Sequence, residues 1–186
     1  MEIDSDCLDD YAFSECKRLK TVELPSSLRV IKKSAFSACG SLESIKIPYG
    51  VDAIQEGTFA FCQNLEDVEI PATVSSIGDE AFLTCSSLKT IKLPDSLTSI
   101  GYHAFLGCES LISIIIPDGI TCIENSTFEN CKRLSSITIP DSVTSIRSWV
   151  FSNCDNLSTI EFLNNVTDIG SWAFEECDSL TTIVLP

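Results

Sequence analysis

The sequence predicts an α/β repeat solenoid, an elongated stack of about eight 23-residue coils with parallel strands on one side and short helical or 3-10 segments opposite. Two periodic residue types carry this prediction. Prolines recur at a spacing of 23 or its multiple, at Pro25, Pro48, Pro71, Pro94, Pro117, Pro140 and Pro186. Phenylalanines keep the same period, at Phe13, Phe36, Phe59, Phe82, Phe105, Phe128, Phe151 and Phe174. Because one such unit cannot bury its own apolar face, we expect its neighbours to complete a continuous core in a single domain spanning residues 1–186.

Each coil begins with the motif Leu-x-x-Ile-x-Ile-Pro, for which residues 42–48 are a clear example. Ile45 and Ile47 alternate with Ser44 and Lys46, which is the period-2 pattern of a strand with one face inward. The proline cannot donate a ladder hydrogen bond and fixes its own φ. The motif therefore predicts a parallel strand that ends in a turn.

The rest of the coil consists of a short extended Val-x-x-Ile piece, a Ser/Thr-rich bend and the motif Ala-Phe-x-x-Cys-x-x-Leu. The spacings of three and four place the alanine, phenylalanine and cysteine on one side of a short helical segment. Only six or seven residues are available for that segment, so a full α-helix about 10 Å across is not expected. The predicted arc is gentle, with the strands on its concave side.

Composition excludes several classes of function. The net charge is −15 and the pI is about 4.2, which argues against nucleic acid or anionic lipid as a partner, because phosphate binding depends on clustered Lys and Arg. No stretch approaches the ~20 apolar residues that a membrane helix needs, and residues 1–6 do not resemble a signal peptide. Met1 falls inside a repeat and Pro186 is followed by no polar cap, so we expect a segment of a longer array.

The ten cysteines raise the question of disulfides or a metal site. Stacked side chains have parallel Cβ vectors, whereas a disulfide needs converging Cβ atoms about 3.8 Å apart. There is no Cys-x-x-Cys pair and only one histidine, which disfavours zinc. The period therefore predicts buried thiols in one core position of every coil. These are Cys16, Cys39, Cys62, Cys85, Cys108, Cys131, Cys154 and Cys177.

The sequence contains no recognisable catalytic constellation. His103 is the only histidine and has no Gly-x-Ser-x-Gly or other nucleophile motif with it, so we interpret it as a surface residue. Nucleotide-binding glycine motifs are also missing, and no cofactor is expected. A carboxylate follows the proline at Asp95, Asp118 and Asp141; this row could attract a cation, but Pro-Asp is also ordinary turn chemistry, which we favour.

Partner-binding candidates come from positions where the outward rows break their pattern. Along one row of the strand face, Glu and Lys alternate until Ile115 interrupts them. An exposed apolar spot with a polar rim is typical of an interaction site, and stacked Trp residues are frequent binding anchors. Simple packing explains the tryptophans equally well, and Phe61 is a weaker third candidate. The candidate residues are Lys89, Lys92, Ile112, Ile115 and Thr138 on the strand face, with Trp149 and Trp172 on the opposite side.

The repeat Leu-x-x-Ile-x-Ile-Pro-x-x-Val-x-x-Ile-Gly-x-x-Ala-Phe-x-x-Cys-x-x-Leu, best kept at residues 65–88 and 88–111, resembles the BspA-type leucine-rich repeat of bacterial and protist surface antigens. The resemblance covers the whole chain and implies a right-handed leucine-rich-repeat solenoid that binds proteins, often in adhesion to host or neighbouring cells. It brings no catalytic, metal or cofactor residues, because the motif residues are core residues.

We therefore expect a non-enzymatic interaction or adhesion module of a cell-surface or secreted protein, with a protein ligand as partner. The alternative is an intracellular, cytoplasmic scaffold, since many free thiols suit a reducing compartment. Three glycosylation sequons, at Asn125, Asn156 and Asn165, would distinguish the two if occupied, although chance explains most sequons in a chain rich in Ser and Thr.

Overall fold

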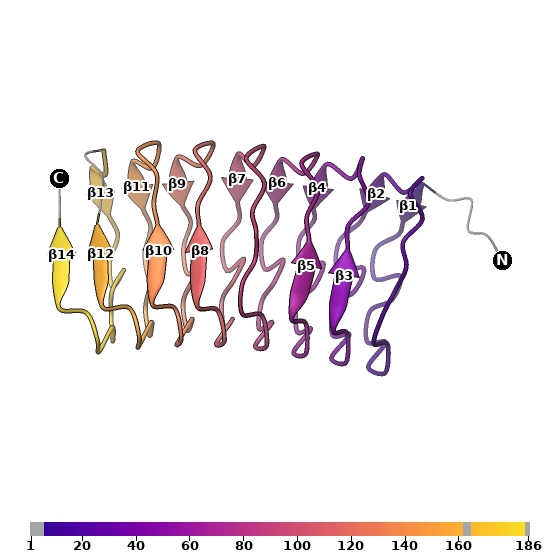
Figure 1. Cartoon of the computed structure of the whole chain (residues 1–186), viewed down its shortest axis with the longest axis horizontal. Helices are drawn as coiled ribbons and strands as arrows, with labels where there is room; N and C mark the ends of the chain where they lie inside the picture. The colour runs from indigo at the N-terminus through magenta and orange to yellow at the C-terminus, as the bar shows by residue number, and fades with distance from the viewer. Residues whose placement is uncertain (1–5, 162–164, 185–186) are drawn as a thin grey trace.

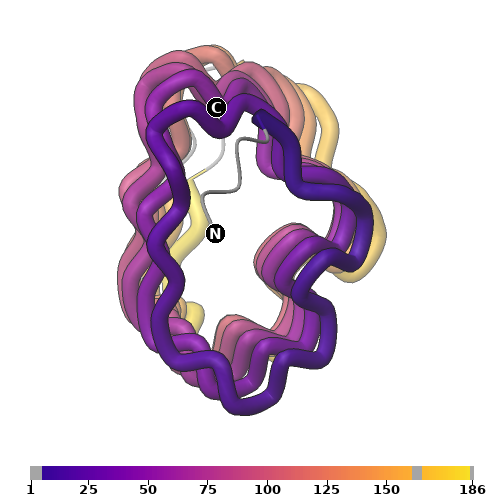
Figure 2. Tube along the Cα trace, turned by 90° about the vertical axis from the view of Figure 1, so that its right-hand side faces the viewer, coloured from indigo at the N-terminus to yellow at the C-terminus, as the bar shows by residue number. Residues whose placement is uncertain are grey.

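The protein is a parallel β-solenoid of about eight turns; the computed structural model describes residues 6–161 and 165–184. Successive coils lie side by side along one long axis (Figure 1). Viewed along that axis, they superimpose on nearly the same outline (Figure 2). The 23-residue period of the sequence is thus the length of one turn, and the predicted fold class is confirmed.

Two ladders of short parallel strands run along the stack, where the sequence indicated only one sheet. The first ladder comes from the Leu-x-x-Ile-x-Ile-Pro motif and contains β3 (Ser44–Lys46), β5 (Asp67–Glu69), β8 (Ser113–Ile115), β10 (Ser136–Thr138), β12 (Thr159–Glu161) and β14 (Thr182–Val184). The second comes from the Val-x-x-Ile segment and contains β1 (Cys7–Leu8), β2 (Val30–Ile31), β4 (Ala53–Ile54), β6 (Ser76–Ile77), β7 (Ser99–Ile100), β9 (Cys122–Ile123), β11 (Ser145–Ile146) and β13 (Asp168–Ile169).

The pairing register follows the period of the sequence. Ile45 pairs with Val68, one coil further on, and the strands of the second ladder show the same offset. In β3 the burial pattern is exposed, buried, exposed, as the alternation of Ser44, Ile45 and Lys46 predicts. Each position of the motif therefore stacks on its own equivalent in the next coil.

The first ladder is interrupted at two coils. Residues 90–93 form no strand, and Thr90 contributes only an isolated bridge to Ser113. Residues 21–24 behave in the same way, with Thr21 bridging to Ser44. A third break, between β10 and β12, falls beside residues 162–164, which lie outside the described residues. The second ladder is divided as well, into β1–β2, β4–β6–β7 and β9–β11–β13, so that among the described residues β7, in the same coil as residues 90–93, pairs with β6 but not with β9.

The side that follows the second ladder consists of tight turns, so the prediction of helical segments there is wrong. In the coil of Ser34 and Ala38, both residues have positive φ, of 53° and 58°, and two left-handed residues four apart cannot belong to a right-handed helix. The amides of Ser37 and Cys39 bond to carbonyls three residues earlier, whereas the Phe36 amide bonds to Thr58 in the next coil. Coil-to-coil hydrogen bonds replace helical ones on this side, and no helix occurs in the described part of the chain.

A ladder of phenylalanine rings forms the centre of the core. Neighbouring rings from Phe13 to Phe174 are stacked, with centroids 5.2–5.8 Å apart and interplanar angles of 3–20°. The six inner rings, from Phe36 to Phe151, are completely buried, and the two end rings are partly buried. This confirms the predicted core ladder. Since each inner ring contacts two others, its loss removes packing in both directions.

We expect Phe105→Ala to lower the free energy of unfolding by about 3–5 kcal/mol, because it removes a fully buried ring and leaves a cavity between two others. Phe13→Ala is the matched control, since its ring is only partly buried at the end of the ladder, and it should cost clearly less. Urea unfolding followed by circular dichroism measures both. Equal losses would contradict the assignment of the inner rings as the main core.

Candidate functional site

The strand-face candidates lie together on the first ladder. Ile115 is 70% exposed and Ile112 is 39% exposed, which is unusual for isoleucine. Thr138 pairs with Ile115 in the neighbouring strand, and the Ile112 amide donates to the Lys89 carbonyl oxygen at 2.9 Å. Lys92 lines the same hollow as Ile115, so the structure brings five of the predicted residues together, Lys89, Lys92, Ile112, Ile115 and Thr138, in what we call the Ile115 patch.

The lysines around this patch differ in their electrostatic partners. Lys89 pairs with Glu66 at 3.1 Å, and Lys46 pairs with Glu69 at 2.5 Å, as expected for cross-strand neighbours of opposite charge. Lys92 has no carboxylate within ion-pair distance in residues 6–161 and 165–184, because Lys46 occupies Glu69 on one side and Ile115 lies on the other. The Ile115 patch thus includes an ammonium group that the protein itself does not neutralise.

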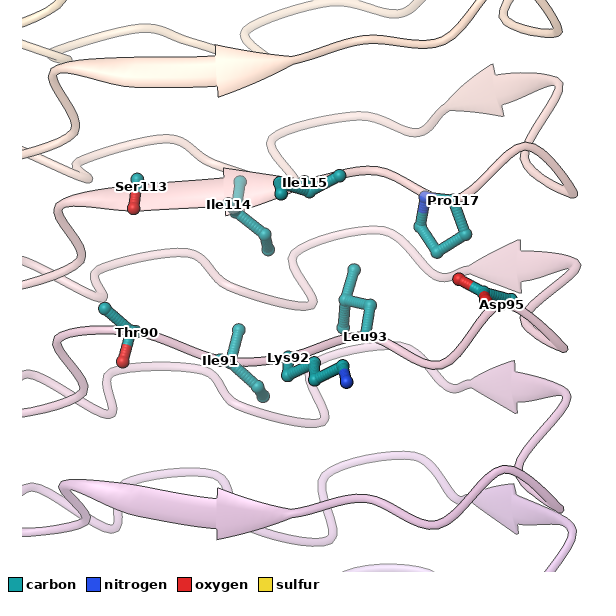
Figure 3. A pocket seen from close by; sticks show the side chains of 9 residues that line it. All are labelled: Thr90, Ile91, Lys92, Leu93, Asp95, Ser113, Ile114, Ile115 and Pro117. Atoms are coloured by element: carbon teal, nitrogen blue, oxygen red, sulfur yellow. The ribbon is translucent and has the colours of Figure 1, made fainter.

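A hollow of about 330 Å³ lies between the unpaired coil and β8. Residues 90–93 and Asp95 line it from one coil, and residues 113–115 and Pro117 line it from the next (Figure 3). Leu93 is 6% exposed and forms part of its apolar surface. The hollow coincides with the interruption of the first ladder.

The second pair of candidates consists of Trp149 and Trp172, which lie in the turns that follow the second ladder. The Ile115 patch lies on the first ladder, so the two candidate surfaces are on different sides of the coil. The rings are stacked, with centroids 5.2 Å apart and an interplanar angle of 10°. Their exposed fractions are 39% and 58%. Both residues occupy the left-handed position of the turn, with φ near 57°. The stacking predicted from the sequence is present, and its exposed edge is available for contact.

Tyr49 is an exposed residue that the sequence analysis missed. It is 75% exposed and lines a hollow of about 430 Å³ together with Val22, Leu24 and Pro48. This hollow also lies beside an unpaired coil, residues 21–24. The signal was present in the sequence, because the position after proline is Asp in three coils but Tyr here.

A third hollow, of about 510 Å³, follows the second ladder around Tyr102 and was also missed. A Cβ atom on Gly101 would lie only 2.5 Å from the Asp79 amide nitrogen, so glycine permits the close approach of the coils here. The charge of Asp79 raises the pKa of Tyr102, and the Tyr102 amide donates to the Asp79 carboxylate at 3.1 Å. In this acidic hollow, the Asp79 carboxylate therefore accepts a backbone hydrogen bond that closes the turn of the next coil.

The cysteine row has a hydrogen-bonding role that the spacing did not reveal. Cys62 donates its S–H to the carbonyl oxygen of Phe36, one coil back, at 3.1 Å. Cys39, Cys85 and the remaining members up to Cys177 repeat this bond at 3.0–3.4 Å. A thiol is small enough for the core and still supplies a weak donor to a carbonyl that would otherwise have one partner.

Burial makes these thiols unreactive. Desolvation raises the pKa of Cys39 to about 11 and that of Cys62 and Cys108 to about 12. It also raises the pKa of Cys85 and Cys131 well above the ordinary value of a thiol. Because the thiolate is the nucleophile and the metal ligand, the buried members of the row cannot serve either purpose in the folded protein. Cys16 is exposed, so the prediction of a buried thiol is wrong at this position, in the first coil of the stack. Among the described residues, no group of three His, Cys, Asp or Glu is placed to hold a metal ion.

The remaining polar candidates do not assemble a reaction centre. His103 lies edge-on to Tyr102, and its Nδ1 atom is 3.9 Å from a Glu80 carboxylate oxygen on the surface. Asp95 lies at the rim of the hollow beneath Ile115. Within the part of the chain that the structure describes, no helix has the length and apolar character needed to cross a membrane.

The sequence matches the family described as BspA type leucine-rich repeat region, in six copies, over residues 3–112 and 76–186. A leucine-rich repeat protein of T. pallidum (TpLRR) has a similar structure, with 31% identity and a TM-score of 0.80; the match covers 85% of this chain and 76% of that one. A leucine-rich repeat protein from Bacteroides ovatus ATCC 8483 has 28% identity and a TM-score of 0.75.

The Bacteroides match covers 95% of this chain, which spans 58% of the length of that protein. A leucine rich cell surface protein from Faecalibacterium prausnitzii A2-165 shares the fold at 23% identity, with a TM-score of 0.59, over 96% of this chain and 69% of that one. No curated protein is significantly similar to the chain.

We expect thiol titration with 5,5′-dithiobis(2-nitrobenzoate) to give a fast phase from Cys16, which is exposed, and slower reaction of the three half-buried cysteines. The six buried thiols should react only on unfolding, and all ten should react in urea. Cys16→Ser should remove the fast phase. Rapid reaction of more than four thiols, or fewer than ten in urea, would contradict the buried-thiol assignment.

We also expect alkaline pH to destabilise the protein through the buried thiols. The pKa of Cys108 in the folded protein is about 12, above the ordinary value of about 8.5. The contribution of the buried thiol to the free energy of unfolding is therefore fully present below pH ~8.5. Above that pH the unfolded state binds fewer protons, and the free energy of unfolding falls by up to about 1.4 kcal/mol per pH unit for each such thiol.

The measurement compares urea unfolding at pH 8 and pH 10. Cys108→Ala should lose less stability than the wild type over this interval, because one buried titrating group is missing. The control Cys16→Ala, at an exposed position, should show the wild-type dependence. Identical pH dependence of all three proteins would exclude this linkage.

Proposed function

Because the chain belongs to the BspA type leucine-rich repeat family, we propose that it is a non-enzymatic protein-binding module within a cell-surface or secreted protein that mediates adhesion. Proteins of this family are typically scaffolds for protein interaction. The motif residues form the core, so partner recognition falls to the positions between them. The observation that carries the proposal is the Ile115 patch.

The Ile115 patch has the composition of an interaction site. Two exposed isoleucines lie beside a hollow, with Lys89, Lys92 and Thr138 as a polar rim. Elsewhere in the same row, cross-strand ion pairs such as Lys46–Glu69 satisfy the exposed side chains. An apolar patch with a polar rim is the usual mark of a protein-binding surface. Trp149 and Trp172 are a second candidate surface, because exposed Trp residues are frequent anchors.

The cell-surface assignment draws on two further observations. The Faecalibacterium protein, which has the same fold, is called a cell surface protein. The buried thiols have high pKa values, so an oxidising compartment would leave them unreacted. The alternative is an intracellular scaffold, which the many thiols also suit. Expression in a secretory system distinguishes the two if a glycan forms on Asn125, Asn156 or Asn165.

The proposal predicts that Ile112→Asp/Ile115→Asp abolishes binding to cell-surface proteins, because two charges are placed in the apolar centre of the patch. The measurement is capture of biotinylated surface proteins from intact bacterial and epithelial cells on the immobilised solenoid. Loss should be at least about tenfold, as expected for a substitution that costs more than 1.4 kcal/mol.

Val30→Asp/Tyr102→Asp is the matched control, because it introduces the same two charges at exposed apolar positions on the second-ladder side. It should bind like the wild type. Unchanged binding by a folded Ile112→Asp/Ile115→Asp protein would remove the Ile115 patch from consideration. Absence of any surface partner for the wild type would count against adhesion itself.

A further inference from the structure

The two coils that leave the first ladder share one sequence feature. In both, the residue before proline is leucine, Leu24 and Leu93, whereas the coils that contribute β3, β5, β8 and β10 have isoleucine there. Leu185 also precedes a proline and its coil still contributes β14, so leucine accompanies the opening without being sufficient for it. The residue before proline is confined to extended conformations, and β-branched side chains favour the pleated strand more than leucine does. We infer that leucine at this position allows the ladder to open, and that the opening contributes to the hollows beside residues 21–24 and 90–93.

At Leu93 the opening extends across three coils. A second hollow, of about 280 Å³, shares Lys92, Leu93 and Asp95 with the one beneath Ile115 and reaches back to Ile70 and Ala72. Together they form a trough, which we call the Leu93 trough, from residues 70–72 to residues 113–117. Two coil spacings of about 4.8 Å correspond to roughly three residues of an extended chain at about 3.3 Å each.

The trough has one charge of each sign, held apart. Lys92 lines both hollows and has no ion-pair partner among the described residues. Asp95 lies farther along, beside Pro117, and Figure 3 shows it on the other side of Leu93 from Lys92. Between them, Leu93 and Ile115 provide apolar surface. An occupant with a carboxylate at Lys92, an apolar side chain at Leu93 and a backbone N–H toward Asp95 would complement all three features.

We propose, resting on the interaction function above, that the Leu93 trough is the seat of an extended partner segment carrying one acidic residue next to an apolar one. The partner segment carries one carboxylate, which is enough to neutralise Lys92. More carboxylates would be repelled by the net charge of −15 of this chain, whereas the repulsion of a single one is screened beyond about 8 Å at physiological salt. The hollow at Leu24 is the nearest competitor on this chain. Its lysine, Lys46, already pairs with Glu69, and Glu23 adds negative charge. The carboxylate of the partner segment is therefore expected to bind in the Leu93 trough rather than in the hollow at Leu24.

The probe is a phage-displayed library of random octapeptides selected on the intact solenoid, followed by fluorescence anisotropy with the synthetic consensus peptide. The selected peptides should carry Asp or Glu beside an apolar residue. Lys92→Gln should weaken binding by up to about fivefold, the range of an exposed ion pair. The control Lys132→Gln, whose lysine lies outside the Ile115 patch and is already paired with Glu109, should leave binding unchanged.

Leu93→Ile tests the opening of the ladder. It should restore strand pairing and thereby slow hydrogen exchange of the backbone amides in residues 90–93. Because the trough becomes narrower, it should also weaken binding of the consensus peptide. Leu24→Ile, the same substitution at the other unpaired coil, should slow exchange in residues 21–24 and leave peptide binding unchanged. Leu93→Ile protein with unchanged exchange, or with slowed exchange and wild-type binding, would overturn the proposal.

A library that yields no consensus, or one without an acid, would also overturn it. These results are separate from the capture of surface proteins. Capture that depends on Ile115, combined with a failed selection, removes the trough and retains the interaction function. A trough that binds its peptide, combined with no captured surface protein, supports the trough and counts against adhesion.

Discussion

The structure depends on hydrogen bonding between successive coils at a fixed offset. The Glu66 amide bonds to the Glu43 carbonyl, 23 residues back, and the Phe36 amide bonds to Thr58, 22 residues ahead. Both ladders and the turn side use such bonds. Because every side of the coil is tied to its neighbour at this spacing, no side can accommodate the width of an α-helix. The same constraint requires like residues to stack on like.

Stacking of like residues explains the choice of core side chains. Rings of phenylalanine tolerate stacking because offset aromatic pairs are favourable, and the measured centroid distances of 5.2–5.8 Å fall in the usual range. A row of buried polar groups would leave donors or acceptors without partners. Cysteine avoids this, since the S–H of Cys62 reaches the Phe36 carbonyl of the preceding coil while its small side chain fits the core.

The constraint acts differently on the surface. Opposite charges stacked one coil apart form ion pairs, as in Lys46–Glu69, Lys89–Glu66 and Lys132–Glu109. Such exposed pairs stabilise little individually, but they give most of the lysines a counter-charge. Where a row breaks, as at Ile115, the neighbouring Lys92 loses its counter-charge. The proposed recognition site therefore lies at a local exception to the repeat.

Periodicity was sufficient to predict the number of coils, the residues of the core and the phenylalanine ladder, because stacking converts sequence position directly into spatial position. For the same reason it predicted the inward cysteines of the inner coils and the position of the Ile115 patch. Periodicity could not predict the turn conformation, since spacings of three and four suit a helix and a pair of β-turns equally; the left-handed φ of residues such as Ser34 and Ala38 follows from bonds to the next coil. Nor could it predict that leucine at Leu93 accompanies an open ladder, that Lys46 pairs with Glu69 and leaves Lys92 alone, or that Tyr49 lines a hollow. Those features depend on which of two neighbouring coils a side chain contacts, and that is determined only when all the coils are packed together.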